Sequence, residues 1–532
     1  MATVADARAS ATREAVVVAR RRAPSWLLMV LSIAVAVVLA APIVFLLIEA
    51  HDANWTTVWN LIWRPLTWTL MWNTIRLTVV VTVLCAIIGT LAAWCVECTD
   101  LPLRRMWAVL VVIPFAIPDF VIAFGWASLS TWVQGFRGAV LVMTLAVYPL
   151  VYLPVAASFR SADPGQEEAA RSLGLGRIQT FVRVTLRQAR GAILGGALVV
   201  TLLILAEYGA FEILGFSTFT TEIFSELQSS FDITGAASLS LVLVGLGIVV
   251  LFGDVLLQGR GRVTRTGAFA QRATRRHSLG RAKIPVLCAF AALVTLALGV
   301  PVGSSVYWMF ERQGSFVAGA SLVSAGINTA VYSASAALLA TIMALPVALY
   351  AVRFGTRISR LLERSTYLVL AVPGVVIALA LTYATERYGA GFGYQSAALL
   401  VVAYAILFFP LALVGVRASV TYAPVGLEEA ARSLGTGRLA VFRRVTLPLV
   451  GPGLAAAFCL VFLAAVTELT ATLLLIPTGA QTLSTQFWAY EQNLSYGQAA
   501  PFALVIIAVA AIPSYVVARY FDRLPARVAR PK

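Results

Sequence analysis

Two stretches of the chain, EEAARSLGLGR at residues 167–177 and EEAARSLGTGR at residues 428–438, are nearly identical and lie 261 positions apart. The same offset pairs Glu207 with Glu468 further along each half. Earlier in the halves the offset is 255, which pairs Asn73 with Asn328 and Pro118 with Pro373. Matches that keep one register over such a distance indicate a tandem duplication of one unit.

The composition places the repeated unit in a membrane. Hydrophobic residues make up 60% of the 532 residues, charged residues 12%, and the mean hydropathy is +0.88. The apolar residues form long runs such as Trp26–Ile48, Thr78–Trp94 and Ile284–Val300. Runs of this length cross about 30 Å of hydrocarbon as helices, which satisfy their own backbone amides in lipid. We therefore expect an all-α integral membrane protein.

The apolar runs predict twelve spans, six in each half. An even number gives both halves the same orientation, so a pseudo-two-fold axis along the membrane normal should relate them. The spans are expected near residues 26–49, 73–96, 107–130, 138–158, 190–214, 236–257, 284–308, 327–351, 366–385, 395–416, 451–475 and 500–520. The corresponding domains are an N-terminal segment 1–25, a first module 26–257, a basic linker 258–283, a second module 284–520 and a tail 521–532.

The formal net charge of +16 is distributed by side of the membrane. With a cytoplasmic N-terminus, 35 of the 40 Lys and Arg residues fall in the inner segments. This is the positive-inside distribution, which predicts that both termini are cytoplasmic. The charge therefore reflects topology and contact with membrane lipid, and we expect no nucleic-acid partner.

Cysteine and histidine give no sign of a metal site. Cys95 and Cys98 form a lone CxxC without a second pair or a nearby His, so small apolar packing explains them. His51 and His277 are predicted on opposite sides of the membrane and cannot share an ion.

A long cytoplasmic loop joins the fourth and fifth spans of each half, and it is too long for a simple connection. In the first half Asp163 and Pro164 are placed to begin a helix, Gly174 allows a sharp break, and a second helix should start near Arg177. The second half repeats this design up to Gly435. Two similar helix–Gly–helix elements on one face suit docking onto two similar partners.

The loops resemble a known signature. The pattern EAA, three residues, Gly, nine residues, Ile-x-Leu-Pro is characteristic of permease subunits of binding-protein-dependent ABC importers. The matching residues are Glu168, Ala169, Ala170, Gly174, Val184 and Leu186, then Glu429, Ala430, Ala431, Gly435, Val445, Leu447 and Pro448, with Glu167 and Glu428 directly before. Val replaces Ile in both copies, and Arg187 stands where the first copy would carry Pro.

The resemblance implies that two six-helix, type I importer modules in one chain form the whole membrane channel in the inner membrane of a bacterium. Each loop would be a coupling helix seated on an ABC ATPase subunit, with two ATPase copies per chain and one chain per complex. Replacing Glu168, Gly174, Glu429 or Gly435 would then uncouple transport.

The energy source must be another polypeptide. A phosphate-binding loop needs Gly-Lys-Ser/Thr, and the two lysines, Lys283 and Lys532, follow Ala and Pro. We therefore expect no cofactor on this chain, ATP and Mg on the partner ATPase, and an extracytoplasmic binding protein to deliver substrate.

Within the permeases, the double-length form resembles the ferric-iron branch. AEYGAFEILGFSTFTTEIF (206–224) and TELTATLLLIPTGAQTLSTQFWAY (467–490) are similar to its stretches after the coupling loops. Fused permeases for thiamine and for an aminoalkylphosphonate are the alternatives.

A translocation path is expected near Glu207, Tyr208 and Glu468. A carboxylate in a span costs about 2.5–3.5 kcal/mol to insert, so it should face an aqueous path or a partner. Two converging carboxylates suit a hard cation such as ferric iron. The alternative is that they hydrogen-bond neighbouring helices or the binding protein. Pro118 and Pro373 place breaks that either line a gate or simply bend the helices.

Two other classes of protein are less compatible with the sequence. An ion-coupled secondary transporter of six plus six parallel helices would not need two EAA loops. A membrane enzyme would need a nucleophile with a nearby base or a spaced metal-binding cluster, and the sequence contains neither pattern.

Overall fold

The computed structural model describes most of the chain. The described residues are 26–52, 55–162, 164–258, 277–311, 319–354, 358–359, 362, 368–389, 393 and 395–511. The predicted segment 1–25, most of the linker and the tail 521–532 lie outside these residues, as does the predicted cap Asp163.

Helices form all the regular structure of the described residues, which confirms the predicted all-α class. The first half contains α2 (Trp26–Asp52), α3 (Trp55–Ile62), α4 (Pro65–Cys98), α5 (Arg104–Leu110), η1 (Ile113–Ala116), α6 (Asp119–Ala127), η2 (Thr131–Val133), α7 (Phe136–Val147), α8 (Pro149–Arg160), α9 (Pro164–Ser172), α10 (Arg177–Thr180), η3 (Phe181–Thr185), α11 (Leu186–Ala206), α12 (Gly209–Ile213), α13 (Phe219–Gln228) and α14 (Ile233–Gln258).

The second half repeats this order. It contains η4 (Gly280–Ala282), α15 (Lys283–Val294), η5 (Thr295–Gly299), α16 (Val300–Phe310), α17 (Gly319–Phe354), η6 (Leu368–Ala371), α19 (Gly374–Tyr388), α20 (Ala397–Leu407), α21 (Phe409–Tyr422), α22 (Val425–Ser433), α23 (Arg438–Val441), η7 (Phe442–Thr446), α24 (Leu447–Val466), α25 (Thr470–Leu475), α26 (Leu483–Gln492) and a last helix, Tyr496–Ala511.

Over the described residues, each predicted span coincides with a helix or with consecutive helices. Among the described residues, eight helices are long and apolar enough to cross a membrane, and ten spans result if each bent pair counts as one. The predicted span 107–130 bends by 91° between Ala116 and Asp119, at the break that Pro118 predicts. Within the predicted span 366–385, the α-helix α19 begins only at Gly374, because the short turn η6 precedes it.

Two predicted spans end earlier than their hydropathy suggests. The predicted span 190–214 breaks after Ala206, and the predicted span 451–475 breaks after Val466. In each case a glutamate follows the break, and its carboxylate accepts hydrogen bonds from the next short helix. Hydropathy alone misses these breaks because both flanks are apolar.

The two halves repeat the same interactions at the end that carries α13 and α26. The Asn73 amide donates to the carbonyl of Ser217 at 3.0 Å, and the matching Asn328 donates to the carbonyl of Gln481 at 2.9 Å. The helices that follow, α13 and α26, both begin with a Thr–Thr capping box. The duplication seen in the sequence is therefore preserved in the structure.

The halves exchange their first spans. Helix α2 of the first half packs on α17 and α19, whereas α16 of the second half packs on α6. The two hydrophobic cores accordingly combine residues of both halves: Phe290 and Phe502 belong to the core of α4–α12, and Leu39 belongs to the core of α17–α25. The two halves therefore interlock across their boundary.

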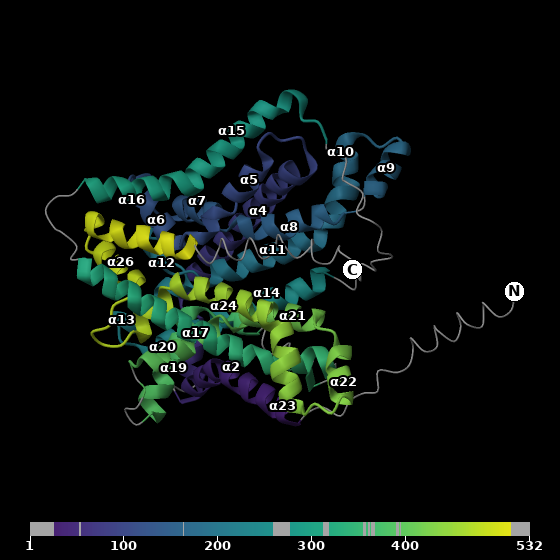
Figure 1. The fold of residues 1–532 in the computed structure, drawn as a ribbon. Coiled ribbons are helices and arrows are strands. Elements are labelled where there is room, and N and C mark those ends of the chain that lie inside the picture. The colour runs from purple at the N-terminus through teal and green to yellow at the C-terminus, as the bar shows by residue number, and fades with distance from the viewer. Residues whose placement is uncertain are drawn as a thin grey trace.

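The two loop helices lie toward the same end of the molecule. In Figure 1, α9 and α10 are above α22 and α23 at the right, while α13 and α26 are at the opposite end. This arrangement agrees with the expectation that both loops face one side of the membrane.

Substitution of Gly125 tests whether α16 of the second half packs closely on α6 of the first. A methyl group at Gly125 of α6 would lie 2.6 Å from Cα of Pro301 in α16, whereas one at Gly303 of α16 meets nothing within 4 Å. Overpacking of this kind costs about 1–3 kcal/mol. Gly125→Ala should lower the melting temperature of the detergent-solubilised protein, and the matched Gly303→Ala should not. Equal melting temperatures would show that α6 and α16 do not pack closely.

Candidate functional site

The first loop element, residues 164–185, reverses direction through a backbone turn. Leu175 N–H donates to the carbonyl of Ala170 at 3.1 Å, and Gly174 N–H donates to the carbonyl of Arg171 at 3.0 Å. This pair of bonds is a Schellman motif, which places one residue in the left-handed region. Gly174 has φ +86°, and Gly435 repeats the turn with φ +83°. Glycine is required at both positions because a side chain would strain this backbone.

A carboxylate joins each loop helix to the start of the fifth span. Glu167 Oε1 accepts a hydrogen bond from the Thr185 hydroxyl at 2.5 Å, and Glu428 Oε1 accepts one from the Thr446 hydroxyl at 2.6 Å. Both threonines close a short π-helical turn, η3 and η7, that leads directly into α11 and α24. A π turn inside an α-helix often marks a functional position.

Glu428 is the more strongly held of the two carboxylates. It is 4% exposed and forms ion pairs with Arg353, at the end of α17, and with Arg432 at 3.9 Å. Burial raises the pKa of Glu428, but the hydrogen bonds from Thr446 and Arg353 outweigh burial and lower the pKa below its usual value. The Glu428 carboxylate is therefore ionised at neutral pH. Its contacts stabilise the folded protein there, and this stabilisation is lost as the pH falls through the lowered pKa.

The second glutamate of each EEAA stretch points outward. Glu168 and Glu429 are exposed, and so are Ala169 and Ala430, whereas Ala170 is buried. Ala431 is half-buried. In each motif the first glutamate thus makes an internal contact, and the second lies on the surface.

Large apolar side chains are exposed at matching positions of the two loops. Leu173 is 84% exposed and Leu434 is 85% exposed, and Ile178 and Leu439 form a second exposed pair. Apolar side chains grouped on a polar surface mark interaction sites. The two loops therefore present the same apolar contact, as two identical partners would require.

Glu207 and Glu468 lie at the other ends of the two fifth-span helices. Glu207 follows α11 and accepts a hydrogen bond from Ala210 N–H at 2.8 Å. Glu468 follows α24 and accepts from Ala471 N–H at 2.9 Å and from the Thr472 hydroxyl at 2.9 Å. Each carboxylate thus caps the next short helix, in agreement with the alternative that they bond to neighbouring helices.

Asp119 adds a third carboxylate that sequence reasoning missed. It is the first residue of α6, directly after Pro118, and both Asp119 and Glu468 act electrostatically on Glu207. With the 255-residue offset its counterpart is Gly374, where an added methyl group would lie 3.1 Å from Glu468 Oε1. Asp119 and Gly374 are therefore equivalent positions, each next to the glutamate that follows a fifth-span helix. Only the first half has an acidic residue there.

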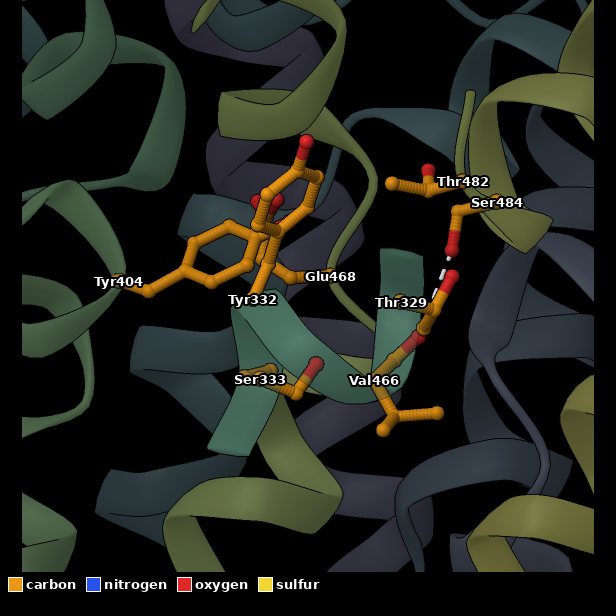
Figure 2. Close-up of a pocket in the computed structure, with 9 residues that line it drawn as sticks. Thr329, Tyr332, Ser333, Tyr404, Val466, Glu468, Thr482 and Ser484 are labelled. Atoms are coloured by element: carbon orange, nitrogen blue, oxygen red, sulfur yellow. Dashed lines mark hydrogen bonds between the residues drawn. The ribbon is translucent and has the colours of Figure 1, made fainter. Parts of the chain in front are cut away.

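The surroundings of Glu468 are rich in oxygen. Tyr332, Ser333 and Tyr404 surround Glu468 so closely that no space for a water molecule remains between them, and the two tyrosine rings lie beside its carboxylate (Figure 2). The Tyr404 hydroxyl hydrogen-bonds to Thr472, which in turn donates to Glu468. The Ser333 side chain is 1% exposed and its hydroxyl has no hydrogen-bond partner.

The remaining predicted path residues have packing roles in this structure. Tyr208 is buried between the rings of Phe224 and Trp488, at 4.4 and 5.6 Å between centroids. Pro118 and Pro373 each precede the helix that follows a break, α6 and α19. Within the described part of the chain, no three His, Cys, Asp or Glu residues are arranged to hold a metal ion.

Sequence reasoning also missed the partners of the loop glutamates. These are Thr185, Thr446, Arg353 and, for Glu167, His277. The identical spacing of Glu and Thr in both halves was a usable signal. Arg353 and His277 gave none, because they are distant in the sequence and differ between the halves.

Two interlocked helical halves, each with the same loop on the same side, define a membrane permease that is driven by subunits outside the membrane. Residues 86–263 and 336–530 each match the family described as binding-protein-dependent transport system inner membrane component. The chain belongs to this family. It is a multi-pass inner-membrane permease of an ABC importer, a class that works with an ATPase and a substrate-binding protein and is not itself an enzyme.

Several relatives are permeases with stated substrates. The chain is 35% identical over 506 residues to the Fe(3+)-transport system permease protein FbpB 2 of Haemophilus influenzae, covering 94% of this chain and 99% of the relative. It is 24% identical to the ferric transport system permease protein FbpB of Actinobacillus pleuropneumoniae, covering 75% of this chain and 63% of that protein. The sulfate transport system permease protein CysT of Salmonella typhimurium is 27% identical over 42% of this chain and 89% of its own length.

The two adjacent glutamates of the second loop should respond differently to the same substitution. Glu428→Gln removes the charge that pairs with half-buried Arg353, and leaving such a partner unsatisfied costs about 1–3 kcal/mol. The melting temperature of the isolated permease should therefore fall more with Glu428→Gln than with Glu429→Gln, because Glu428 is buried and Glu429 is exposed. The reverse order would mean that Glu429 is the internal contact.

Proposed function

We propose that this permease passes ferric iron from an extracytoplasmic binding protein into the cytoplasm, driven by two ATPase subunits docked on its two loops. The principal support is the 35% identity to an Fe(3+)-transport permease over 99% of that relative. The relatives named for sulfate match a much smaller part of this chain.

The oxygen ligands along the proposed path suit a cation. Asp119, Glu207 and Glu468 place three carboxyl groups at helix breaks within the membrane region, and Ser333 and Tyr404 lie close to Glu468. Ferric iron is a hard cation that prefers oxygen ligands, whereas carboxylates repel an oxyanion such as sulfate. We infer that Glu207 and Glu468 contact the iron in transit, with Asp119 beside them.

The two loops provide the docking sites. We infer that Leu173 and Leu434, with the adjacent Glu168 and Glu429, meet equivalent surfaces of two ATPase copies. A matched exposed apolar side chain on each loop supports this inference. Because one chain carries both loops, we propose one permease chain with two ATPases.

The loops connect directly to the carboxylates through the fifth spans. Glu167 and Glu428 tie the loop helices to η3 and η7, and the helices that follow, α11 and α24, run to Glu207 and Glu468. Helices of 21 and 20 residues are about 30 Å long at about 1.5 Å per residue. We infer that closure of the ATPases moves the loops, and that these helices carry the movement to the carboxylates.

The proposed orientation places both termini and both loops in the cytoplasm. It rests on the distribution of Lys and Arg and on the position of α9, α10, α22 and α23 at one end of the molecule (Figure 1). The module boundaries 26–257 and 284–520, with the basic linker 258–283 between them, are proposed as the repeat units of one assembly.

Uptake by proteoliposomes tests the substrate. The permease is reconstituted with its ATPase and binding protein, and ATP-dependent uptake of ferric iron is measured beside thiamine and sulfate. We expect uptake of iron but not of thiamine or sulfate. Glu468→Gln should reduce the rate of iron uptake at least about tenfold, and a tenfold change corresponds to about 1.4 kcal/mol. The double variant Glu168→Gln with Glu429→Gln should insert normally and lose uptake.

ATP-dependent uptake of thiamine or sulfate without iron would overturn the substrate while keeping the importer. Iron uptake that is insensitive to Glu207→Gln, Glu468→Gln and Asp119→Asn together would remove the carboxylates from the path.

A further inference from the structure

The two loop glutamates have different side-chain partners, although the loops are almost identical in sequence. Glu428 pairs with Arg353, the penultimate residue of α17. With the 255-residue offset, the counterpart of Arg353 in α4 is Cys98, a buried thiol that offers no positive charge. The first half therefore lacks its own equivalent of Arg353.

His277 occupies this place in the first half. His277 Nε2 lies 3.4 Å from Glu167 Oε2, and the Arg171 guanidinium lies 3.0 Å from His277 Nδ1. The imidazole ring stacks on Trp94 of α4, with 6.3 Å between ring centroids. A residue that precedes the second half thus contacts the first loop helix and the inner end of α4 together.

Backbone hydrogen bonds hold His277 in this position. Its N–H donates to the carbonyl of Cys98 at 2.8 Å, and its carbonyl accepts from Asp100 N–H at 3.1 Å. These bonds form a one-residue parallel bridge with Thr99. The backbone of His277 is therefore held against the end of α4, which brings its side chain within reach of Glu167.

Asp100 fastens the segment that follows His277. Its Oδ1 accepts from Leu279 N–H at 2.8 Å, and its Oδ2 pairs with Lys283 Nζ at 2.9 Å. The Leu279 hydrogen bond and the Lys283 ammonium lower the pKa of Asp100, so the pair is ionised at neutral pH. Residues 277–283 are thus joined to the end of α4 and lead into α15.

We propose that His277 is a positioning residue that replaces Arg353 in the first half, so that residues 277–283, at the join between the halves, form part of the first coupling loop. The inference rests on the proposed coupling role of the two loops. Residues 277–283 would then do more than connect the two halves. They would position the first loop helix, α9, on which an ATPase subunit docks.

The test resolves the two loops separately. The ATPase subunit is titrated onto the detergent-solubilised full-length permease, and binding is measured by isothermal calorimetry. The unaltered permease should bind two ATPases with similar affinity. His277→Ala should weaken one site about fivefold and leave the other unchanged, as expected for the loss of one partly exposed pair.

Three further variants make the result specific. His277→Arg should restore the weakened site, because it supplies the charge that Arg353 supplies in the other half. Arg353→Ala should weaken one site and, combined with His277→Ala, both. His51→Ala, at the outer end of α2, is the control and should change neither site.

A coupling cycle keeps the proposal testable if His277→Arg folds poorly. The effects of Glu167→Gln and His277→Ala on the first site should be non-additive, because each removes the same contact. Additive effects, or unchanged binding by His277→Ala while Glu167→Gln weakens a site, would overturn the role of His277 alone. Unchanged binding by Glu167→Gln and Glu428→Gln together would instead overturn the docking role of the loops.

Discussion

One hydrogen bond, made twice, determines how the loops are joined to the membrane helices. Glu167 accepts from Thr185, and Glu428 accepts from Thr446, across the turn that the left-handed glycines allow. Without this bond each loop helix would connect to its span through a flexible turn. With it, the loop helix is held against the π turn that leads into the long fifth-span helix.

The two hydrophobic cores link the halves to which the loops are joined. Because α2 packs against the second half and α16 against the first, neither half can move without displacing a span of the other. A displacement applied at both loops therefore acts on one continuous assembly. The carboxylates at the far ends of α11 and α24 lie where the two halves meet, since a methyl group at Gly209 would lie 2.7 Å from Leu469.

The repeat accounts for most of what the sequence predicted correctly. Two copies of one motif located the loop helices, the glycines at 174 and 435 and the second helical stretch from Arg177. Such features depend on local residue type, so a local pattern reports them. The match of residues 86–263 and 336–530 to one family confirmed the duplicated permease.

Long-range contacts account for what the sequence did not predict. Hydropathy continues through the breaks at Glu207 and Glu468, so the carboxylates looked like residues inside uninterrupted spans. The sequence analysis gave no role to Asp119, because its relation to Glu207 depends on the fold. Arg353 and His277 fill one role from unrelated positions, and a search for repeats cannot find residues that the repeats do not share.

The central claim is that one chain of 56.8 kDa supplies both loops and therefore the whole membrane part of the importer. Native mass spectrometry of the complex, assembled with its ATPase and extracted from the membrane, measures this directly. We expect a mass equal to one permease chain and two ATPase subunits. A complex containing two permease chains would contradict the claim.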